Sequence, residues 1–216
     1  MSHLYELERF VLRLIFNYVH GSEKILDVGC GKGIWSHLIR SRNGCERVHI
    51  IGIDIFKPYL RLCRKFNLYD DLLLCHACFL PFRGEVFDVV LASEIIEHLT
   101  KDEGLRMLNE LERVSIGRVI ITCPQGYEPR KGKSVNVEEH RSAWYASELK
   151  RKGYHVFGIG CRIVKYAFTK DWLFGVLLYL CTPISYLIPE FGGFLVAYKD
   201  ILRNNNVRRG INKNEL

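Results

Sequence analysis

Short apolar runs alternate with amphipathic segments along most of the chain. The runs are rich in Ile, Val and Leu and have the length of strands buried on both faces of a sheet; they cover residues 24–28, 48–53, 72–75, 86–92 and 119–123. Between them, apolar residues recur at helical spacing over about residues 33–41, 57–66 and 101–115. The alternation predicts a doubly wound α/β domain with a mainly parallel sheet, whose ligands bind beyond the carboxyl ends of the strands.

The pattern changes before residue 21 and after residue 123. Helical periodicity predicts an amphipathic leading helix over residues 3–20. The polar stretch from Pro124 to Glu139 is too long for a tight turn and predicts a functional or mobile loop. A helix over about 145–152 and two strands, 155–164 and 194–199, follow it. We therefore divide the chain into a leading helix (1–20), one α/β domain (21–200) with a hydrophobic insertion (171–190), and a basic polar tail (201–216).

The composition is that of a globular protein, since 48% hydrophobic and 25% charged residues exclude a largely disordered chain. The eight cysteines lack the spacing of a disulfide framework, so we expect reduced thiols. The charged sequence MSHLYELERF has no apolar run of the kind found in secretory signals, which predicts a cytoplasmic protein. The net charge of +7 favours an anionic partner or an anionic membrane surface without choosing between them.

A glycine-rich turn follows the first predicted strand. In ILDVGCGKGIW, Gly29, Gly31 and Gly33 allow a sharp turn and a close approach of the backbone to a ligand. The spacing is G-x-G-x-G, with Ile34 where dinucleotide enzymes have their third glycine, which argues against NAD. Asp54 ends the second strand, where a carboxylate can accept hydrogen bonds from both hydroxyls of a ribose.

These motifs, followed in order by FDVVLASEIIEHL at Phe87–Leu99, resemble those of the class I S-adenosylmethionine (SAM)-dependent methyltransferases, and the type 11 branch in particular. The resemblance covers about residues 22–165. It implies a Rossmann-like, doubly wound, mainly parallel seven-stranded sheet with an antiparallel last strand, and SAM as the cofactor. The residues that it assigns to the cofactor are Asp27, Gly29, Cys30, Gly31, Asp54, Ile55, Ala77 and Ser93.

By this resemblance Asp27, Gly29 and Gly31 line the amino-acid end of SAM, Asp54 holds the ribose, and Ile55 packs on the adenine. The sequence departs from the family in CHACFLPF, where His76 replaces the usual acidic residue, so we do not count His76 among the ligands. Cys75 and Cys78 form a C-x-x-C without a second pair, which favours packing over a zinc or redox role.

The segment SEIIEHL carries the candidate chemistry. On one helical turn, Glu94, Glu97 and His98 would share a face at the ligand edge of the sheet, and His140 could join them from the following loop. Similar Glu-x-x-Glu-His segments in small-RNA terminal 2′-O-methyltransferases and ubiquinone-pathway O-methyltransferases support a metal that polarises the accepting hydroxyl. The resemblance thus implies a divalent cation held by these four residues. Without a metal, His98 or His140 could act as a general base, and both could also be structural.

The acceptor is less well determined. Residues 172–189, WLFGVLLYLCTPISYLIP, contain no charged residue, but Thr182 and Pro183 interrupt them, and strands on both sides argue against a membrane span. We interpret the insertion as a surface that grips a hydrophobic or lipid-like acceptor or contacts a membrane peripherally. A buried helix and a dimer interface are the alternatives.

Two further functions remain open. Short basic clusters, Arg130–Lys133 in the loop and Arg203–Lys213 in the tail, permit an RNA acceptor, but no RNA-binding module accompanies them, so nucleic acid is the weaker expectation. A non-catalytic SAM-binding regulatory subunit is the third. The sequence therefore predicts a SAM-dependent methyltransferase acting on a small, hydrophobic or lipid-like acceptor, with O-methylation favoured and metal-assisted 2′-O chemistry on RNA as the alternative.

Overall fold

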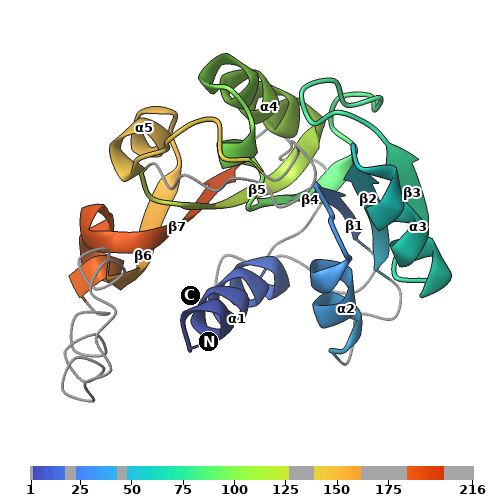
Figure 1. Cartoon of the computed structure of the whole chain (residues 1–216), viewed down its shortest axis with the longest axis horizontal. Coiled ribbons are helices and arrows are strands. Elements are labelled where there is room, and N and C mark those ends of the chain that lie inside the picture. The colour runs from blue at the N-terminus through green and yellow to red at the C-terminus, as the bar shows by residue number, and fades with distance from the viewer. Residues whose placement is uncertain (1, 18–22, 43–47, 127–138, 162–183, 202–216) are drawn as a thin grey trace, which may run out of the picture.

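The structure is a computed structural model that describes residues 2–17, 23–42, 48–126, 139–161 and 184–201. Seven strands form one sheet (Figure 1): β1 (Lys24–Val28), β2 (His49–Asp54), β3 (Asp71–Leu74), β4 (Phe87–Ser93), β5 (Ser115–Pro124), β6 (His155–Cys161) and β7 (Gly192–Asp200). The helices are α1 (Ser2–Phe16), α2 (Ile34–Arg40), α3 (Lys57–Lys65), α4 (Lys101–Val114) and α5 (Ala146–Arg151). Two 3₁₀ turns, η1 (Ile96–His98) and η3 (Pro189–Phe191), complete the described elements.

The strand order is β3-β2-β1-β4-β5-β7-β6. The first five strands pair in parallel, whereas β7 runs antiparallel to both β5 and β6. This confirms the predicted doubly wound, mainly parallel seven-stranded sheet with an antiparallel last strand. The order reverses between β1 and β4, so the carboxyl ends of these strands flank the crevice where ligands of such sheets bind.

Each face of the sheet is covered by its own helices. One core cluster joins α4 and α5 to strand residues such as Leu26 and Val90, and the other joins α1, α2 and α3 to their neighbours Ile25 and Val89. Figure 1 shows α4 and α5 above the sheet and α1 and α2 below it. Because successive strand residues point to opposite faces, a strand that is apolar throughout places side chains in both core clusters.

The element boundaries agree with the hydrophobic pattern to within a few residues. Helix α4 begins with a capping box, in which the Thr100 backbone N–H donates to Glu103 Oε2 at 2.8 Å and the Glu103 N–H donates to Thr100 Oγ1 at 3.3 Å. Several predicted features lie outside the described residues: the loop over 127–138, residues 162–183 with most of the insertion, and the tail from 202 onwards. Among the described residues, no helix combines the length and apolar character needed to cross a membrane.

Candidate functional site

The glycine turn is clamped to the end of β2. The backbone N–H groups of Gly29 and Cys30 both donate to the Ile53 carbonyl, at 2.8 and 2.9 Å. Gly29, Gly31 and Gly33 all have positive φ, where a side chain is unfavourable. The sequence forms this turn because only glycine combines these backbone angles with the close contacts around them.

The three glycines differ in what surrounds them. A Cβ at Gly29 would lie 2.5 Å from Ile95 Cδ1, and one at Gly33 would lie 2.4 Å from Leu68 Cδ1, so a side chain at either position would displace its neighbour. Among the described residues, a Cβ at Gly31 would meet only the Gly29 carbonyl oxygen, at 4.0 Å. The space beside Gly31 is therefore open, and its bare backbone can be approached by a ligand.

Asp54 connects the end of β2 to this open space. Its Oδ2 accepts from the Gly31 N–H at 2.9 Å, and its Oδ1 accepts from the Phe56 N–H at 2.7 Å. A carboxylate oxygen has two acceptor positions, so each oxygen retains one for a ligand hydroxyl. The next side chain, Ile55, is 53% exposed and offers an apolar surface beside the carboxylate.

Asp27, near the end of β1, is buried, and only one of its two carboxylate oxygens has a hydrogen-bond partner among the described residues. Its Oδ2 accepts from the Tyr69 hydroxyl at 2.6 Å, whereas its buried Oδ1 has no hydrogen-bond partner among the described residues. Burial raises the pKa of Asp27 from 3.8 to about 7; the Tyr69 hydrogen bond opposes this rise and the nearby Asp54 charge adds to it. A buried acceptor of this kind marks the place where a ligand donor would bind.

The side chains of three other residues predicted to bind the cofactor are buried or hydrogen-bonded within the protein. The Cys30 side chain is buried in the core below the sheet, where burial raises the pKa of its thiol well above its ordinary value. Ala77 is also buried. Ser93, at the end of β4, shares a 2.7 Å hydrogen bond with the Thr122 hydroxyl.

The C-x-x-C segment stabilises its own turn. Nδ1 of His76 accepts from the Cys78 N–H at 3.2 Å, and the His76 carbonyl accepts from the Phe79 N–H. Cys78 Sγ donates to the Glu103 carbonyl, while Cys75 Sγ donates to the Phe79 carbonyl. The two thiols thus serve separate structural contacts, and burial raises the pKa of each.

Glu97, His98 and His140 form one cluster, in which one potential ligand atom from each residue lies within 4.8 Å of the others. Glu97 and His140 are buried, and the imidazoles of His98 and His140 meet edge to face at 4.9 Å. His98 Nδ1 lies 3.1 Å from the Glu139 carbonyl oxygen, which can only accept, so Nδ1 carries the proton in the neutral ring. Its Nε2 then has a lone pair on the side of Glu97, with Oε1 at 3.9 Å.

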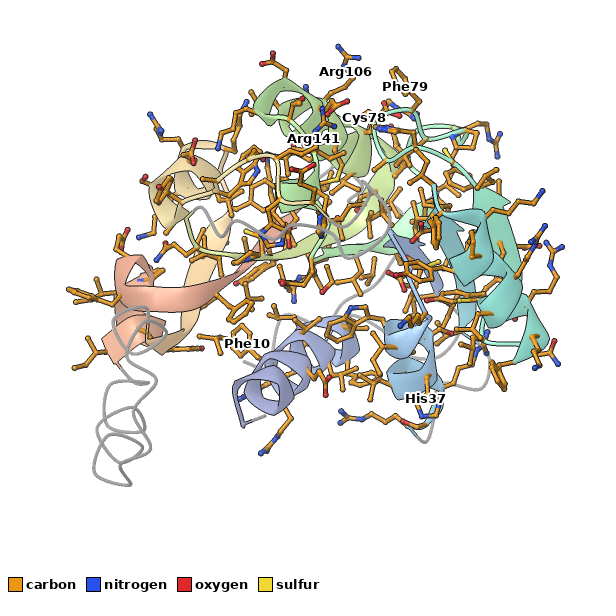
Figure 2. All side chains as sticks on the ribbon, in the orientation of Figure 1. Phe10, His37, Cys78, Phe79, Arg106 and Arg141 are labelled. Carbon is orange, nitrogen blue, oxygen red and sulfur yellow. The ribbon has the colours of Figure 1, made fainter. Side chains whose placement is uncertain are left out.

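The segment that carries His140 is fixed to η1 by its backbone. The Glu97 carbonyl accepts from the N–H groups of Arg141 and Ser142, at 2.7 and 3.1 Å. The buried Trp144 indole N–H is shared between the Ile96 carbonyl and Ser142 Oγ, at 3.2 and 2.9 Å. Figure 2 shows Arg141, next to His140 in the chain, beside α4. Hydrogen bonds between this segment and η1 therefore hold His140 beside His98.

Helix α4 packs against the Trp144 ring. The Lys101 ammonium lies 3.5 Å from the centre of the Trp144 ring and donates to the Ala143 carbonyl at 2.7 Å. Gly104 allows the ring to pack on the helix, because a Cβ there would lie 2.4 Å from Trp144 Cζ2.

Glu94 does not belong to the cluster, which corrects the expectation of a shared helical face. The backbone at Glu94 turns left-handed, with φ +53°, and the helical turn begins only at Ile96. Glu94 Oε1 instead accepts from the Thr122 hydroxyl at 3.1 Å. Sequence analysis also missed Tyr69 and Trp144, whose site contacts come from distant segments that no local pattern reveals.

Comparisons with known proteins agree with this geometry. Residues 25–115 match the model of a family described as a methyltransferase domain. A human protein called probable tRNA methyltransferase 9B is 31% identical over 93 residues, which are 43% of this chain and 19% of that protein. The match thus spans about a fifth of the length of this relative.

Two solved structures share the fold at low identity. A putative methyltransferase of Haloferax volcanii, in complex with the Trm112 methyltransferase activator, is 17% identical with a TM-score of 0.60, covering 86% of this chain and 84% of its own. A Haemonchus contortus phosphoethanolamine N-methyltransferase 2, solved in complex with SAM, is 16% identical with a TM-score of 0.60, covering 94% and 52%.

The matched domain begins in β1 and ends at the start of β5, so it contains the glycine turn, Asp54 and η1. The sheet order and the antiparallel β7 extend the agreement to the rest of the described fold. Residues 25–115 therefore match a methyltransferase domain, and the described sheet has the fold of these two methyltransferase structures.

Proposed function

We propose that the protein transfers the methyl group of SAM to an oxygen of its acceptor, in front of the cluster of Glu97, His98 and His140. The observation that carries the proposal is the contact between the segment that leads into η1 and the glycine turn. Ile95, which immediately precedes η1, packs against Gly29 so closely that a Cβ there would lie 2.5 Å from its Cδ1. A cofactor on the turn and a base at η1 therefore share one edge of the sheet.

The residues around the turn fit SAM group by group. Asp27 Oδ1 would accept a hydrogen bond from the ammonium at the amino-acid end of SAM. The open space at Gly31 would let SAM lie against the backbone there. Asp54 would hold the ribose hydroxyls, while the exposed Ile55 side chain would pack on the adenine. Gly29, Cys30, Ala77 and Ser93 would complete the lining through their backbones. The SAM in the phosphoethanolamine N-methyltransferase structure supports this choice of ligand.

The chemistry that remains for the protein is modest. SAM supplies a methyl group on a positively charged sulfur, which is an activated leaving group. His98 Nε2 would take the proton of the acceptor hydroxyl as its oxygen bonds to the methyl carbon and the bond from carbon to sulfur breaks. The Glu139 carbonyl keeps Nδ1 protonated, and the Glu97 carboxylate stabilises the imidazolium that forms. Positioning supplies the rest of the rate.

A divalent cation is the alternative occupant of the cluster. One carboxylate and two imidazoles suit such an ion, and the Glu139 carbonyl is the kind of outer partner that orients a ligating histidine. Bound there, it would lower the pKa of an acceptor hydroxyl. Metal analysis and turnover after chelation separate the two mechanisms: full turnover of metal-free protein supports the base, and turnover restored only by added cation supports the metal.

A hydrophobic or lipid-like acceptor is favoured by the surface beside η3. The large apolar side chains of Ile184, Leu187, Ile188 and Phe191 are all exposed, with Leu187 at 79%. Ile184, Leu187 and Ile188 belong to the uncharged run 172–189, so peripheral contact with a membrane is also proposed. Such a surface suits an isoprenoid or lipid better than a charged metabolite.

RNA is the second candidate acceptor, favoured by the human relative with a tRNA methyltransferase name. That relative matches fewer than half of the residues of this chain. The net charge of +7 is compatible with RNA. A third possibility is a SAM-binding regulatory subunit without transfer activity.

One experiment distinguishes these functions. Purified protein is incubated with methyl-labelled SAM and a whole-cell extract, and the organic, RNA and protein fractions are counted. We expect label in the organic fraction. Label in RNA would replace the hydrophobic acceptor by the second candidate, and SAM binding without transfer to any fraction would favour the regulatory subunit. Protein with His98→Ala is the matched control for transfer by other enzymes in the extract.

A pair of glycine variants tests the cofactor site. Gly31→Ala is expected to weaken SAM binding by more than tenfold, because the methyl group fills the open space, while destabilising the fold by only about 1 to 2 kcal/mol for the left-handed backbone. Gly33→Ala is expected to destabilise the fold more, because its Cβ also meets Leu68 at 2.4 Å. Calorimetric titration and urea unfolding measure both effects. Equal SAM affinity of Gly31→Ala and wild type would contradict the assignment.

A further inference from the structure

Tyr69 reaches the proposed cofactor site from a separate part of the chain. It lies before β3, is 8% exposed, and donates its hydroxyl hydrogen to Asp27 Oδ2 at 2.6 Å. Nothing in the glycine motif specifies this contact, because the two residues are 42 positions apart.

The Tyr69 ring is fixed between the glycine turn and β2. A Cβ at Gly33 would lie 3.3 Å from its Cε2, and a Cβ at Gly52 would lie 2.9 Å from its Cδ1. Two glycines on different elements thus make room for the same ring. The ring has little freedom to rotate, and its hydroxyl is held at the Asp27 carboxylate.

We propose that Tyr69 is a positioning residue for the cofactor: it holds one carboxylate oxygen of Asp27 so that the other faces the ammonium of SAM. The inference rests on the proposed SAM site and adds a residue outside the family motif. It predicts a particular pH dependence of cofactor binding.

The groups that face Asp27 determine the direction of this dependence. The pKa of Asp27 is raised to about 7, chiefly by burial; the Tyr69 hydrogen bond opposes this rise and the Asp54 charge contributes to it. The thiols of Cys30 and Cys63 also interact with Asp27, but the pKa of each is raised, so both stay neutral. Removing the hydroxyl therefore shifts the ionisation of Asp27 to higher pH.

The test is calorimetric titration with S-adenosylhomocysteine (SAH), which has the same amino-acid end as SAM, from about pH 6 to about pH 8.5. Wild-type affinity is expected to rise as Asp27 ionises, with its midpoint near 7. For Tyr69→Phe we expect the curve displaced to higher pH, with about tenfold weaker binding at neutral pH that largely recovers at the alkaline end. Tyr198→Phe, which removes a hydroxyl from β7, is the matched control.

The alternative outcomes are distinct. A purely structural Tyr69 would give an affinity loss that is equal at every pH, and an unchanged profile would also overturn the inference. If wild-type protein bound no SAH at any pH, both the inference and the proposed function would be rejected. Circular dichroism of both variants confirms that the comparison is made between folded proteins.

Discussion

Replacing Asp27 with asparagine is expected to make the ligand-free protein more stable above neutral pH while abolishing cofactor binding. The pKa of Asp27 is raised from 3.8 to about 7 in the folded protein, chiefly by burial. Between these values the folded chain keeps a proton that the unfolded chain has released, so wild-type stability falls as the pH rises through this window. Asparagine carries no charge and is free of this penalty.

The size of the effect follows from the shift. About three pKa units correspond to a destabilisation on the order of 4 kcal/mol, fully present above pH 7 and absent below about pH 4. Urea unfolding at several pH values should show the Asp27→Asn variant gaining on wild type as the pH rises. A constant difference would contradict the buried, ligand-dependent carboxylate.

Adding SAH provides the internal control. The ligand should stabilise wild-type protein, because it binds only the folded state, and leave Asp27→Asn nearly unaffected. This result would show that the Asp27 carboxylate, which lowers the stability of the ligand-free protein, is needed for cofactor binding. If the variant bound SAH as well as wild type does, Asp27 would be a structural residue.

Sequence analysis predicted the sheet well because its central strands, such as β1 and β4, are apolar runs buried on both faces. Ile25 and Val89 pack in one core and their neighbours Leu26 and Val90 pack in the other, so an uninterrupted apolar run identifies each of these strands. The glycine turn and Asp54 were also identifiable, since their roles depend on neighbours in the chain and on the end of a strand. Their contact, the Gly31 N–H to Asp54 hydrogen bond, is observed.

The candidate site was harder to predict where it depends on local backbone geometry. Helical spacing grouped Glu94 with Glu97 and His98, but a left-handed residue at Glu94 separates it from the turn. Tyr69 could not be found from the sequence, because its position depends on how the chain before β3 packs under the glycine turn. The structure does bring His140 against His98, while the chemical roles of both stay predictions.

Replacing His98 with alanine is the change expected to cost most activity. If Nε2 takes the acceptor proton, turnover should fall by roughly 10²-fold to 10⁴-fold, the usual contribution of a general base. Binding of SAH should change by less than about twofold, because Asp27, Asp54 and the glycine turn are untouched. The measurement is the steady-state rate with the acceptor found in the extract experiment, alongside titration with SAH.

Matched variants separate a base from a support. His37 lies on α2, on the opposite side of the sheet from α4, and Figure 2 shows it well away from Arg141, so His37→Ala should retain full turnover. Added imidazole should partly restore His98→Ala, since a small base can occupy the space that the side chain leaves. Imidazole would not restore turnover if His98 were a metal ligand whose removal releases the cation. It would also not restore turnover if His98 only held His140 in position. Undiminished turnover of His98→Ala would reject both the base and the metal, leaving positioning of SAM and acceptor as the source of the rate.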